Sequence, residues 1–472
     1  MPVAELPFGL VVDLSLWVDI LNLPTSQMVS AIFAIVGWTA AALVFFFMGT
    51  ELWLKLRQSK YTSTWEWVVL AVDVPPDTIQ SPKAVEQIFA HLSGALFEPN
   101  FGQKYWQGVK QSWFSLEIIS LEGYIQFLIY TEAGYRDLVE AAIYAQYPMA
   151  EITEVEDYVG AVPSNFPNDT HEVFGLEFGL AAADPYPIRT YSEFEHSITP
   201  DYTFNDPMAS ILENFTRIGT GENLWFQIII EPISGAWKAK GIELIKTIIA
   251  GKKHSSEQFF LFKLINGLFD ELMKAIRPPS EEGHDHKKEE MPGKLSDLTP
   301  GVRDTVAAIE EKISKIGFKT KCRILYAAPA EIFNPSRCLD GFIGSLNQFD
   351  YHGRNAIVAV SATSAHYAFK NSRTLNIKKK FVAAYKKRKI KVGGNPYILN
   401  IQELATLWHF PLPLVKTPLL QKTASKRAEP PINLPIEEMT ESPLRKRVKE
   451  APVESMDLDE EKEKQPSELP YA

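Results

Sequence analysis

The side chains best suited to bind a ligand lie in a basic run near the C-terminus, Lys378–Lys391 (KKKFVAAYKKRKIK). Cations interleaved with Phe381 and Tyr385 suit phosphate contact combined with base stacking on single-stranded nucleic acid. The same cations suit anionic lipid headgroups or a protein partner. A solvated linker is the remaining interpretation, and the sequence leaves all of these open. The candidate contact residues are Lys378, Lys379, Lys380, Lys386, Lys387, Arg388, Lys389 and Lys391.

No other set of residues has the spacing of a catalytic or cofactor motif. The sequence contains no G-x-x-x-x-G-K-[ST], H-E-x-x-H, C-x-x-C or G-x-S-x-G, and no G-x-G-x-x-G follows a strand pattern. His91, His171 and His409 are expected to be structural or solvated. We therefore predict that the protein is not an enzyme and needs no cofactor.

Metal binding is not expected either. Cys322 and Cys338 match no metal-binding spacing and are expected to be packed thiols. His284 and His286 lie in a polar stretch without supporting ligands. The acidic residues Glu151, Glu154, Glu156 and Asp157 are expected to form a solvated strand edge and turn. The formal net charge of −10 argues against a general nucleic-acid binder.

The elements that must position the basic run begin with an apolar segment, Leu21–Thr50, which has no charged side chain. Its core, residues 28–48, would span about 31 Å as a helix, close to the hydrocarbon thickness of a bilayer. No Lys or Arg precedes it, whereas Lys55, Arg57 and Lys60 follow. This asymmetry predicts a single transmembrane helix (28–50), with segment 1–27 outside and the bulk of the chain in the cytoplasm, at the inner (cytoplasmic) membrane.

Two other interpretations of the apolar segment are weaker. A signal peptide needs a basic start and a shorter apolar core near Met1, and a buried core helix rarely has so long an uncharged stretch. The preceding Phe8–Leu23 is expected to form a short amphipathic helix on the outer membrane surface.

The segment 61–160 predicts a βαββαβ order, which is the ferredoxin-like arrangement. Strands are expected at Trp65–Val74, Trp113–Ser120, Tyr124–Thr131 and Ala150–Tyr158, with helices from Ser81-Pro82 and over Tyr135–Tyr147. The first helix is expected to bury one face that includes Leu96.

A second α/β domain is predicted over 165–350. Its expected strands are His171–Leu180, Asn223–Glu231 and Lys319–Ala328, and its expected helices start at Asp206-Pro207, Thr299-Pro300 and Asn334. This pattern fits a second ferredoxin-like domain interrupted by a helical insertion over 235–298. The insertion contains the helical segments Trp237–Ile249 and Phe259–Ile276, expected to pack as a hairpin, and a polar linker.

The remaining chain divides into a basic and helical region, 351–422, and a tail, 423–472. In the first, Tyr397–Phe410 is expected to be helical, with Asn400 and Glu403 as a capping box. The tail is rich in Pro, Glu and Lys and poor in apolar residues, which predicts disorder. The overall prediction is an α+β protein with an N-terminal transmembrane helix, two ferredoxin-like domains and a disordered C-terminal tail.

Several segments resemble a bacterial family: membrane-anchored proteins similar to the N-terminal, non-catalytic region of the conjugation and type IV secretion assembly ATPases, a domain of unknown function. The resemblance covers about residues 55–434. The matching residues are Ser81-Pro82, Glu86–Phe89, Tyr135–Ala141, Tyr144–Pro148, Glu154–Tyr158, Asp206-Pro207, Tyr326–Pro329, Tyr397–Asn400, Glu403–Leu407 and Val415–Pro418.

The resemblance implies a non-enzymatic, membrane-anchored scaffold or assembly subunit of a type IV secretion or conjugation-like apparatus. Its implied partners are a separate P-loop motor ATPase and other secretion components, and self-association is a further expectation. The chain departs from those ATPases by continuing into the tail where their nucleotide-binding domain begins, so ATP hydrolysis is not carried over. A membrane-tethered protein that binds single-stranded nucleic acid is the alternative function.

Overall fold

The computed structural model describes residues 3–6, 10–13, 22–75, 78, 80–194, 206–250, 299–351, 353–364 and 370–412. Several predictions lie outside these ranges: the helical segment Phe259–Ile276, the pair His284 and His286, the similarity at Val415–Pro418 and the tail 423–472.

The N-terminal segment begins with two short antiparallel strands, β1 (Val3–Leu6) and β2 (Leu10–Asp13). The prediction of a helix starting at Phe8 is therefore wrong over Leu10–Asp13. The strand sequence LVVD contains two adjacent β-branched valines, which favour an extended backbone once a pairing partner is present.

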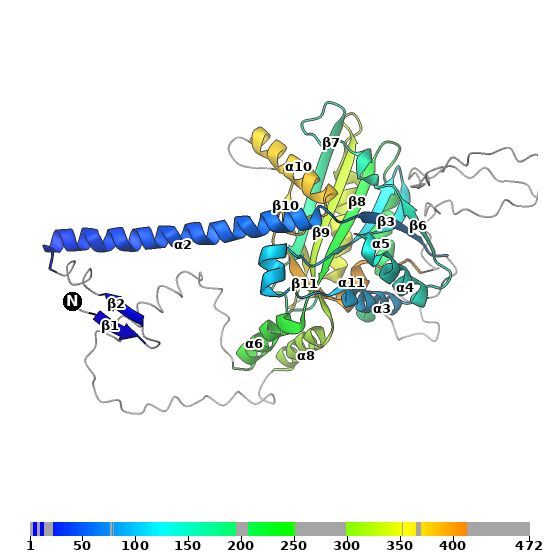
Figure 1. Ribbon diagram of the computed structural model, residues 1–472. Helices are drawn as coiled ribbons and strands as arrows, with labels where there is room; N and C mark the ends of the chain where they lie inside the picture. The colour runs from blue at the N-terminus through cyan, green and yellow to red at the C-terminus, as the bar shows by residue number, and fades with distance from the viewer. Residues whose placement is uncertain are drawn as a thin grey trace, which may run out of the picture.

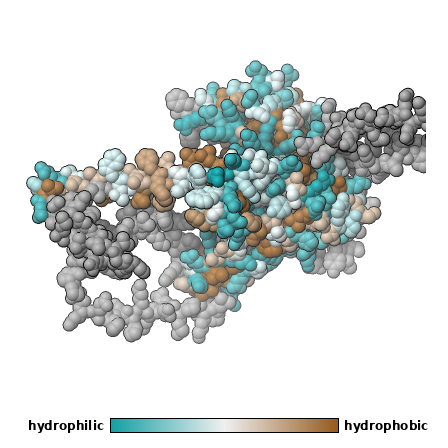
Figure 2. Space-filling view, in the orientation of Figure 1, coloured by the Kyte–Doolittle hydropathy of each residue, from teal (hydrophilic) through white to brown (hydrophobic). Residues whose placement is uncertain are grey.

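A long helix, α2 (Thr25–Thr62), contains the apolar segment and leaves the body of the protein as a single rod (Figure 1). Within the described residues it is the one helix long and apolar enough to cross a membrane. It extends beyond the predicted 28–50 at both ends, so Lys55, Arg57 and Lys60 belong to the same helix as the apolar core. Figure 2 shows its pale and brown surface projecting from a body coloured mostly teal and white.

The body is built on one antiparallel sheet with the strand order β10-β7-β9-β8-β4-β5-β3-β6. A further strand, β11, pairs with the first residues of the long β9. The strands are β3 (Trp67–Asp73), β4 (Phe114–Leu121), β5 (Tyr124–Glu132), β6 (Glu151–Val155), β7 (His171–Leu180), β8 (Asn223–Pro232), β9 (Gly317–Pro329), β10 (Ile357–Ala362) and β11 (Tyr397–Asn400).

The strands of the two predicted domains form this one sheet together. The first four have the order β6-β3-β5-β4, and the next four repeat it as β10-β7-β9-β8. The second strands of the two sets, β4 and β8, pair along their lengths from Phe114↔Ile230 to Leu121↔Asn223. The sheet therefore continues from one predicted domain into the other, although the sequence placed a domain boundary at residues 160–165.

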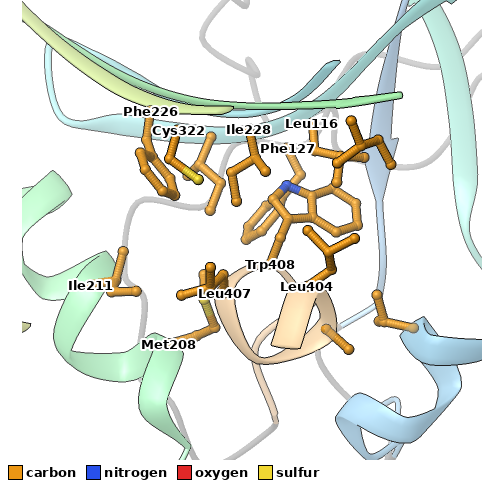
Figure 3. Packing of buried hydrophobic residues seen from close by; sticks show 14 of the residues in the cluster. Leu116, Phe127, Met208, Ile211, Phe226, Ile228, Cys322, Leu404, Leu407 and Trp408 are labelled. Atoms are coloured by element: carbon orange, nitrogen blue, oxygen red, sulfur yellow. The ribbon is translucent and has the colours of Figure 1, made fainter. Parts of the chain in front are cut away.

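One face of the sheet is covered by α3 (Pro82–Leu92), α4 (Arg136–Gln146), α5 (Pro207–Thr216), α9 (Ser336–Leu346) and α11 (Ile401–Leu407). Figure 3 shows Trp408 packed against the sheet residues Leu116, Phe127 and Ile228, with Leu404 on the helix side of the ring. The central strands are buried on both faces, and successive residues face opposite sides, as a pleated strand requires: Leu70 packs under these helices, whereas Val69 and Ala71 pack in a second cluster on the other face. Leu96, predicted to be buried with α3, is instead exposed.

The insertion between β8 and β9 begins with α6 (Lys238–Ile249) and ends with α8 (Pro300–Ser314). These two helices pack on each other through Leu244, Ile245, Ile309 and neighbouring apolar residues. The described partner of α6 is therefore α8.

Two elements of the C-terminal region were not predicted from the sequence: the edge strand β10 and the helix α10 (Lys370–Lys386). The predicted capping box is confirmed, since Asn400 Oδ1 accepts from the Glu403 amide at 2.8 Å and Glu403 Oε2 accepts from the Asn400 amide at 2.9 Å. The predicted helix over Tyr397–Phe410 starts later, because Tyr397–Asn400 forms β11.

Candidate anion-binding surface

The basic run lies at the end of α10, on the sheet face opposite the five covering helices. Only the second half of α10 has apolar residues at helical spacing, namely Phe381, Val382, Ala384 and Tyr385, and these are buried against the sheet. The Phe381 ring packs directly over Gly175 of β7, where a Cβ atom would come within 2.1 Å of it. The first half of α10 is polar and largely exposed.

The chain leaves the helix through Arg388, which lies two residues after Lys386 and has a left-handed backbone with φ of 46°. The Lys389 amide donates to the Ala384 carbonyl, and the Arg388 amide donates to the Tyr385 carbonyl. This is the hydrogen-bond pattern of a helix C-terminus that normally has glycine at the left-handed position. An arginine there costs about 1–2 kcal/mol in backbone strain, so its side chain must be held in place by other contacts.

Those contacts are made by the carboxylates of Glu117 and Asp157. Arg388 Nε and Nη2 donate to the two Glu117 oxygens, each at 3.0 Å, and Arg388 Nη2 also donates to Asp157 Oδ1 at 2.9 Å. The guanidinium also lies 4.0 Å from the centre of the Tyr130 ring. Burial alone would raise the pKa of Glu117, but the charge and hydrogen bonds of Arg388 outweigh it and lower that pKa below its ordinary value.

Glu117 belongs to a polar row that crosses four neighbouring strands in register. Glu117 on β4 is opposite Gln227 on β8, which is opposite Arg323 on β9, which is opposite Glu177 on β7. All four side chains are buried. Gln227 Nε2 donates to Glu117 Oε1 at 2.9 Å, and Arg323 Nε donates to Glu177 Oε1 at 2.9 Å.

Lys321 and two members of the polar row hold the chain that follows α10. Lys321 Nζ donates to the Val392 carbonyl at 2.7 Å, and Glu177 Oε2 accepts from the Gly394 amide at 2.7 Å. Arg323 also donates to the Val392 carbonyl. Because buried charges are costly without partners, these contacts fix the path of the basic run over the sheet.

The eight predicted contact residues therefore fall into two groups. Three have partners within the protein: Lys378 pairs with Glu172, Lys386 donates to the Val162 carbonyl and Ser164 Oγ, and Arg388 is enclosed as described. Five remain exposed: Lys379, Lys380, Lys387, Lys389 and Lys391. Phe381 and Tyr385, the aromatic residues proposed for base stacking, are buried against the sheet.

Two of the exposed lysines join a cluster that the sequence did not predict. Lys389 and Lys391, together with Lys319, each lie close enough to Lys110 to lower its pKa. The main cause of that shift is burial, and the pKa falls to about 8, although Glu231 opposes the change. We call Lys110, Lys319, Lys389 and Lys391 the lysine cluster.

The lysine cluster rests on an aromatic base. Lys110 Nζ lies 4.0 Å from the centre of the Trp113 ring, and Trp113 contacts both Trp65 and Trp67 at the root of α2. Ile390, between two members of the cluster, is buried against this base. Lys319 forms an ion pair with Glu231 at 3.2 Å, which leaves the cluster with an excess of positive charge.

The two cysteines and His409, whose side chains could in principle be reactive, are packed in the interior of the protein. Burial raises the pKa of both Cys322 and Cys338 to about 12, which removes their thiolates at neutral pH. His409 is buried and bonds to Asp206 Oδ1 at 2.9 Å, which links α5 to the end of α11. Among the residues that the structure describes, no group of three or more His, Cys, Asp or Glu could hold a metal ion.

The acidic turn predicted to be solvated is in part an ion-pair partner. Asp157 pairs with Arg388, and Glu154 accepts from Arg136 Nη1 at 2.6 Å. The sequence does contain a signal for the polar row, since Glu117, Gln227, Arg323 and Glu177 are each a polar residue inside an apolar strand.

These features define an α+β protein with a candidate membrane helix, a continuous antiparallel sheet and a lysine-rich surface near the root of that helix. The chain belongs to a family described as a domain of unknown function (DUF8128), whose model matches residues 106–422, about two thirds of the sequence. The match begins at the segment that contacts α2 and ends beyond α11. No curated protein matches the chain.

Proposed function

We propose that this protein is a non-enzymatic scaffold or assembly subunit of a bacterial type IV secretion or conjugation-like apparatus, anchored in the cytoplasmic membrane. The similarity at Tyr135–Ala141, Tyr144–Pro148 and the other matching segments supports this proposal. In it, the N-terminus lies outside and the body lies in the cytoplasm, as the Lys and Arg distribution favours. Energy would come from a separate P-loop motor ATPase.

The repeated strand order supports a finer description of the body as two ferredoxin-like halves. Each half alternates strands and helices as βαββαβ, and each has its first strand between its third and fourth. In this proposal, the halves join through β4 and β8 and form one rigid platform. The outer strands β6 and β10 are then edges available to partner proteins or to a second copy.

The observation that carries the proposal is the rigid connection between α2 and the body. The helix runs without a break for 38 residues, from the apolar core to contacts with the body at Trp53 and Arg57. A flexible tether would suit an enzyme that searches for substrate. A rigid helix holds the body at a fixed position over the membrane, as an assembly subunit needs.

Purification of the full chain from solubilised membranes tests this function. We expect a P-loop ATPase and other secretion components to co-purify, and we expect a charge reversal of exposed residues on an edge strand to reduce their recovery. Recovery of neither class of partner under mild detergent conditions would contradict the proposal.

Within this function, the lysine cluster is proposed to be attracted by the anionic leaflet from which α2 emerges, without contact with its headgroups. The cluster lies beside Trp65, just past the end of α2, and Thr62 follows Met48 by 14 residues, about 21 Å along the helix axis. At that distance the attraction is weaker than the value of about 1 kcal/mol per cation that holds close to the membrane.

Single-stranded nucleic acid remains the alternative ligand, supported by the exposed Lys379, Lys380 and Lys387. The burial of Phe381 and Tyr385 removes the stacking part of that hypothesis and leaves phosphate contact. Salt-dependent binding of an oligonucleotide by the detergent-solubilised chain, lost on changing Lys387 and Lys389 to alanine, would favour nucleic acid. Binding that does not depend on salt would exclude it.

A further inference from the structure

A second surface beside α2 combines order with unusual exposure of large apolar side chains. It lies in the segment 96–107, where the Phe101 side chain is 76% exposed and the Trp106 side chain is 65% exposed. Leu96 and Phe97 are also exposed. Exposed apolar side chains that gather in one place on a protein surface mark a site of contact with a partner or a membrane.

Hydrogen bonds hold this segment in one conformation. Asn100 and Gln103 cap each other, with the Gln103 amide donating to Asn100 Oδ1 at 2.8 Å and the Asn100 amide donating to Gln103 Oε1 at 2.9 Å. Gln111 closes the base of the segment, since its side chain accepts from the Phe97 amide and donates to the Ala95 carbonyl. The exposure of Phe101 is therefore a property of an ordered structure.

The segment is fixed to α2 as well as to the body. Trp53 Nε1 donates to the Tyr105 carbonyl at 2.9 Å, and Arg57 Nε donates to the Trp106 carbonyl at 2.6 Å. The segment lies beside the end of α2 nearest the sheet, as the light blue helical turn below it in Figure 1. These two hydrogen bonds therefore fix the position of the segment along the axis of α2.

This position along α2 corresponds to the level of the lipid headgroups. Trp53 follows Met48, the end of the uncharged core, by five residues, which corresponds to about 8 Å along the helix axis. The headgroup region extends roughly 5–8 Å beyond the hydrocarbon on each side. The Trp53 contact therefore brings the segment to the outer boundary of the bilayer.

The chemistry of the segment suits that boundary. Trp and other amphipathic aromatic side chains concentrate at the level of the headgroups. Trp53 and Trp106 contact each other edge to face, with ring centres 6.5 Å apart. The cations Arg57 and Lys104 lie over the rings of Trp53 and Tyr105, where they can pair with lipid phosphates while the rings contact the acyl chains.

We propose that the segment 96–107 docks on the bilayer, with Phe101 and Trp106 inserted among the lipid headgroups of the leaflet from which α2 emerges. This contact rests on the proposed membrane anchor and extends it, because a second point of attachment prevents the body from rotating about α2. The occupant of the surface is the lipid bilayer itself.

Fluorescent labels on single introduced cysteines test the docking in the full chain, reconstituted in lipid nanodiscs. The native Cys322 and Cys338 are buried with raised pKa values, so they react poorly with thiol reagents. Phe101→Cys places an environment-sensitive fluorophore in the segment. Met149→Cys is the matched control, since Met149 is 75% exposed on a turn between α4 and β6. Val44→Cys places the label in the apolar core of α2.

Lipids carrying a quencher near the headgroup or near the chain end then report the depth of each label. We expect the label at residue 101 to shift its emission to the blue and to be quenched mainly by the shallow lipid, whereas the label at residue 149 is quenched by neither. Labels at 101 and 149 that behave alike, with the label at 44 still quenched, would overturn the docking and leave the anchor intact. Absence of quenching at residue 44 would instead overturn the anchor on which the docking rests.

Protection of residue 101 from a water-soluble quencher, without quenching by either lipid, would also overturn the proposal. It would assign the surface to a protein contact between copies of the chain.

Discussion

Arg388 and Glu117 lie 271 residues apart in the sequence and form a buried ion pair through two parallel hydrogen bonds of 3.0 Å. Glu117 lies on β4, in the first set of strands, whereas Arg388 directly follows α10, two residues after its last residue, Lys386. The pair therefore fixes the end of α10 on the sheet. It also accounts for a non-glycine residue at a left-handed helix end.

Glu117→Gln is expected to lower the free energy of unfolding by about 3–5 kcal/mol, because it leaves the Arg388 charge buried with one carboxylate fewer. The double variant Glu117→Gln with Arg388→Met is expected to lose less than the single variant, since no buried charge is left behind. Chemical denaturation of the full chain in detergent, followed by circular dichroism, measures the free energy of unfolding of both variants. A double variant less stable than the single variant would contradict this account of the pair.

Stability is expected to fall in acid through the same carboxylate. The pKa of Glu117 is lower in the folded protein than its ordinary value of 4.5, so its contribution is complete above pH 4.5 and is lost as the pH falls through the folded pKa. Asp206 behaves alike: burial would raise its pKa, but His409 and two backbone amides lower it below 3.8. Melting temperatures measured over an acid series should fall more steeply for the native chain than for Glu117→Gln. Parallel curves would refute this assignment.

Much of the fold follows from local patterns. The strands from β3 to β9 and the helices beside them have apolar residues at the correct period and clear helix starts such as Asp206-Pro207, so their ranges were predicted to within a few residues. The continuity of the sheet could not be predicted in this way. It depends on the pairing of β4 with β8, a contact between surfaces far apart in the sequence.

The structure of the C-terminal region was harder to predict from the sequence, for a physical reason. In α10, the buried apolar residues occupy only the second half, so the helical period covers barely more than one turn around Phe381 and Tyr385. The basic run was predicted as a surface, yet Arg388 is buried, because its partners come from distant parts of the chain: Glu117 from β4 and Asp157 from the turn after β6. The lysine cluster likewise requires Lys110 and Lys319 to approach residues far along the chain.

Gly175→Ala is expected to loosen α10 on the sheet. A Cβ at this position would lie 2.1 Å from the Phe381 ring, and the ring cannot retreat easily because the following chain is held by Lys321 and the polar row. Overpacking of this kind costs about 1–3 kcal/mol, and denaturation measures it. Gly160→Ala is the matched control, since nothing lies within 4 Å of the added atom there. Equal stability of the two variants would show that Phe381 does not pack as described.

Lys110 is expected to be the most reactive amine among the residues described. With a pKa of about 8, roughly half of its side chain is neutral at pH 8, against well under about 1% for a lysine with the ordinary pKa of 10.5. Mass-spectrometric mapping after brief acetylation should therefore detect Lys110 before Lys240, which is exposed on α6. Lys391→Ala should slow the reaction at Lys110, because it removes a neighbouring positive charge and raises the pKa. A faster reaction in that variant would contradict the lysine cluster.

Gly108→Ala is expected to separate the segment 96–107 from α2. Gly108 has φ of 76°, which disfavours any side chain, and an added Cβ would lie 2.4 Å from the backbone carbonyl group of Arg57. Because backbone on both sides of this contact is fixed, the strain is relieved by moving the segment away from the helix, with loss of the Trp53 and Arg57 hydrogen bonds. Protease cleavage near residue 104 should become faster in the full chain. Gly94→Ala, where nothing lies within 4 Å, should leave cleavage unchanged, and equal rates in both variants would show that this glycine does not hold the segment against α2.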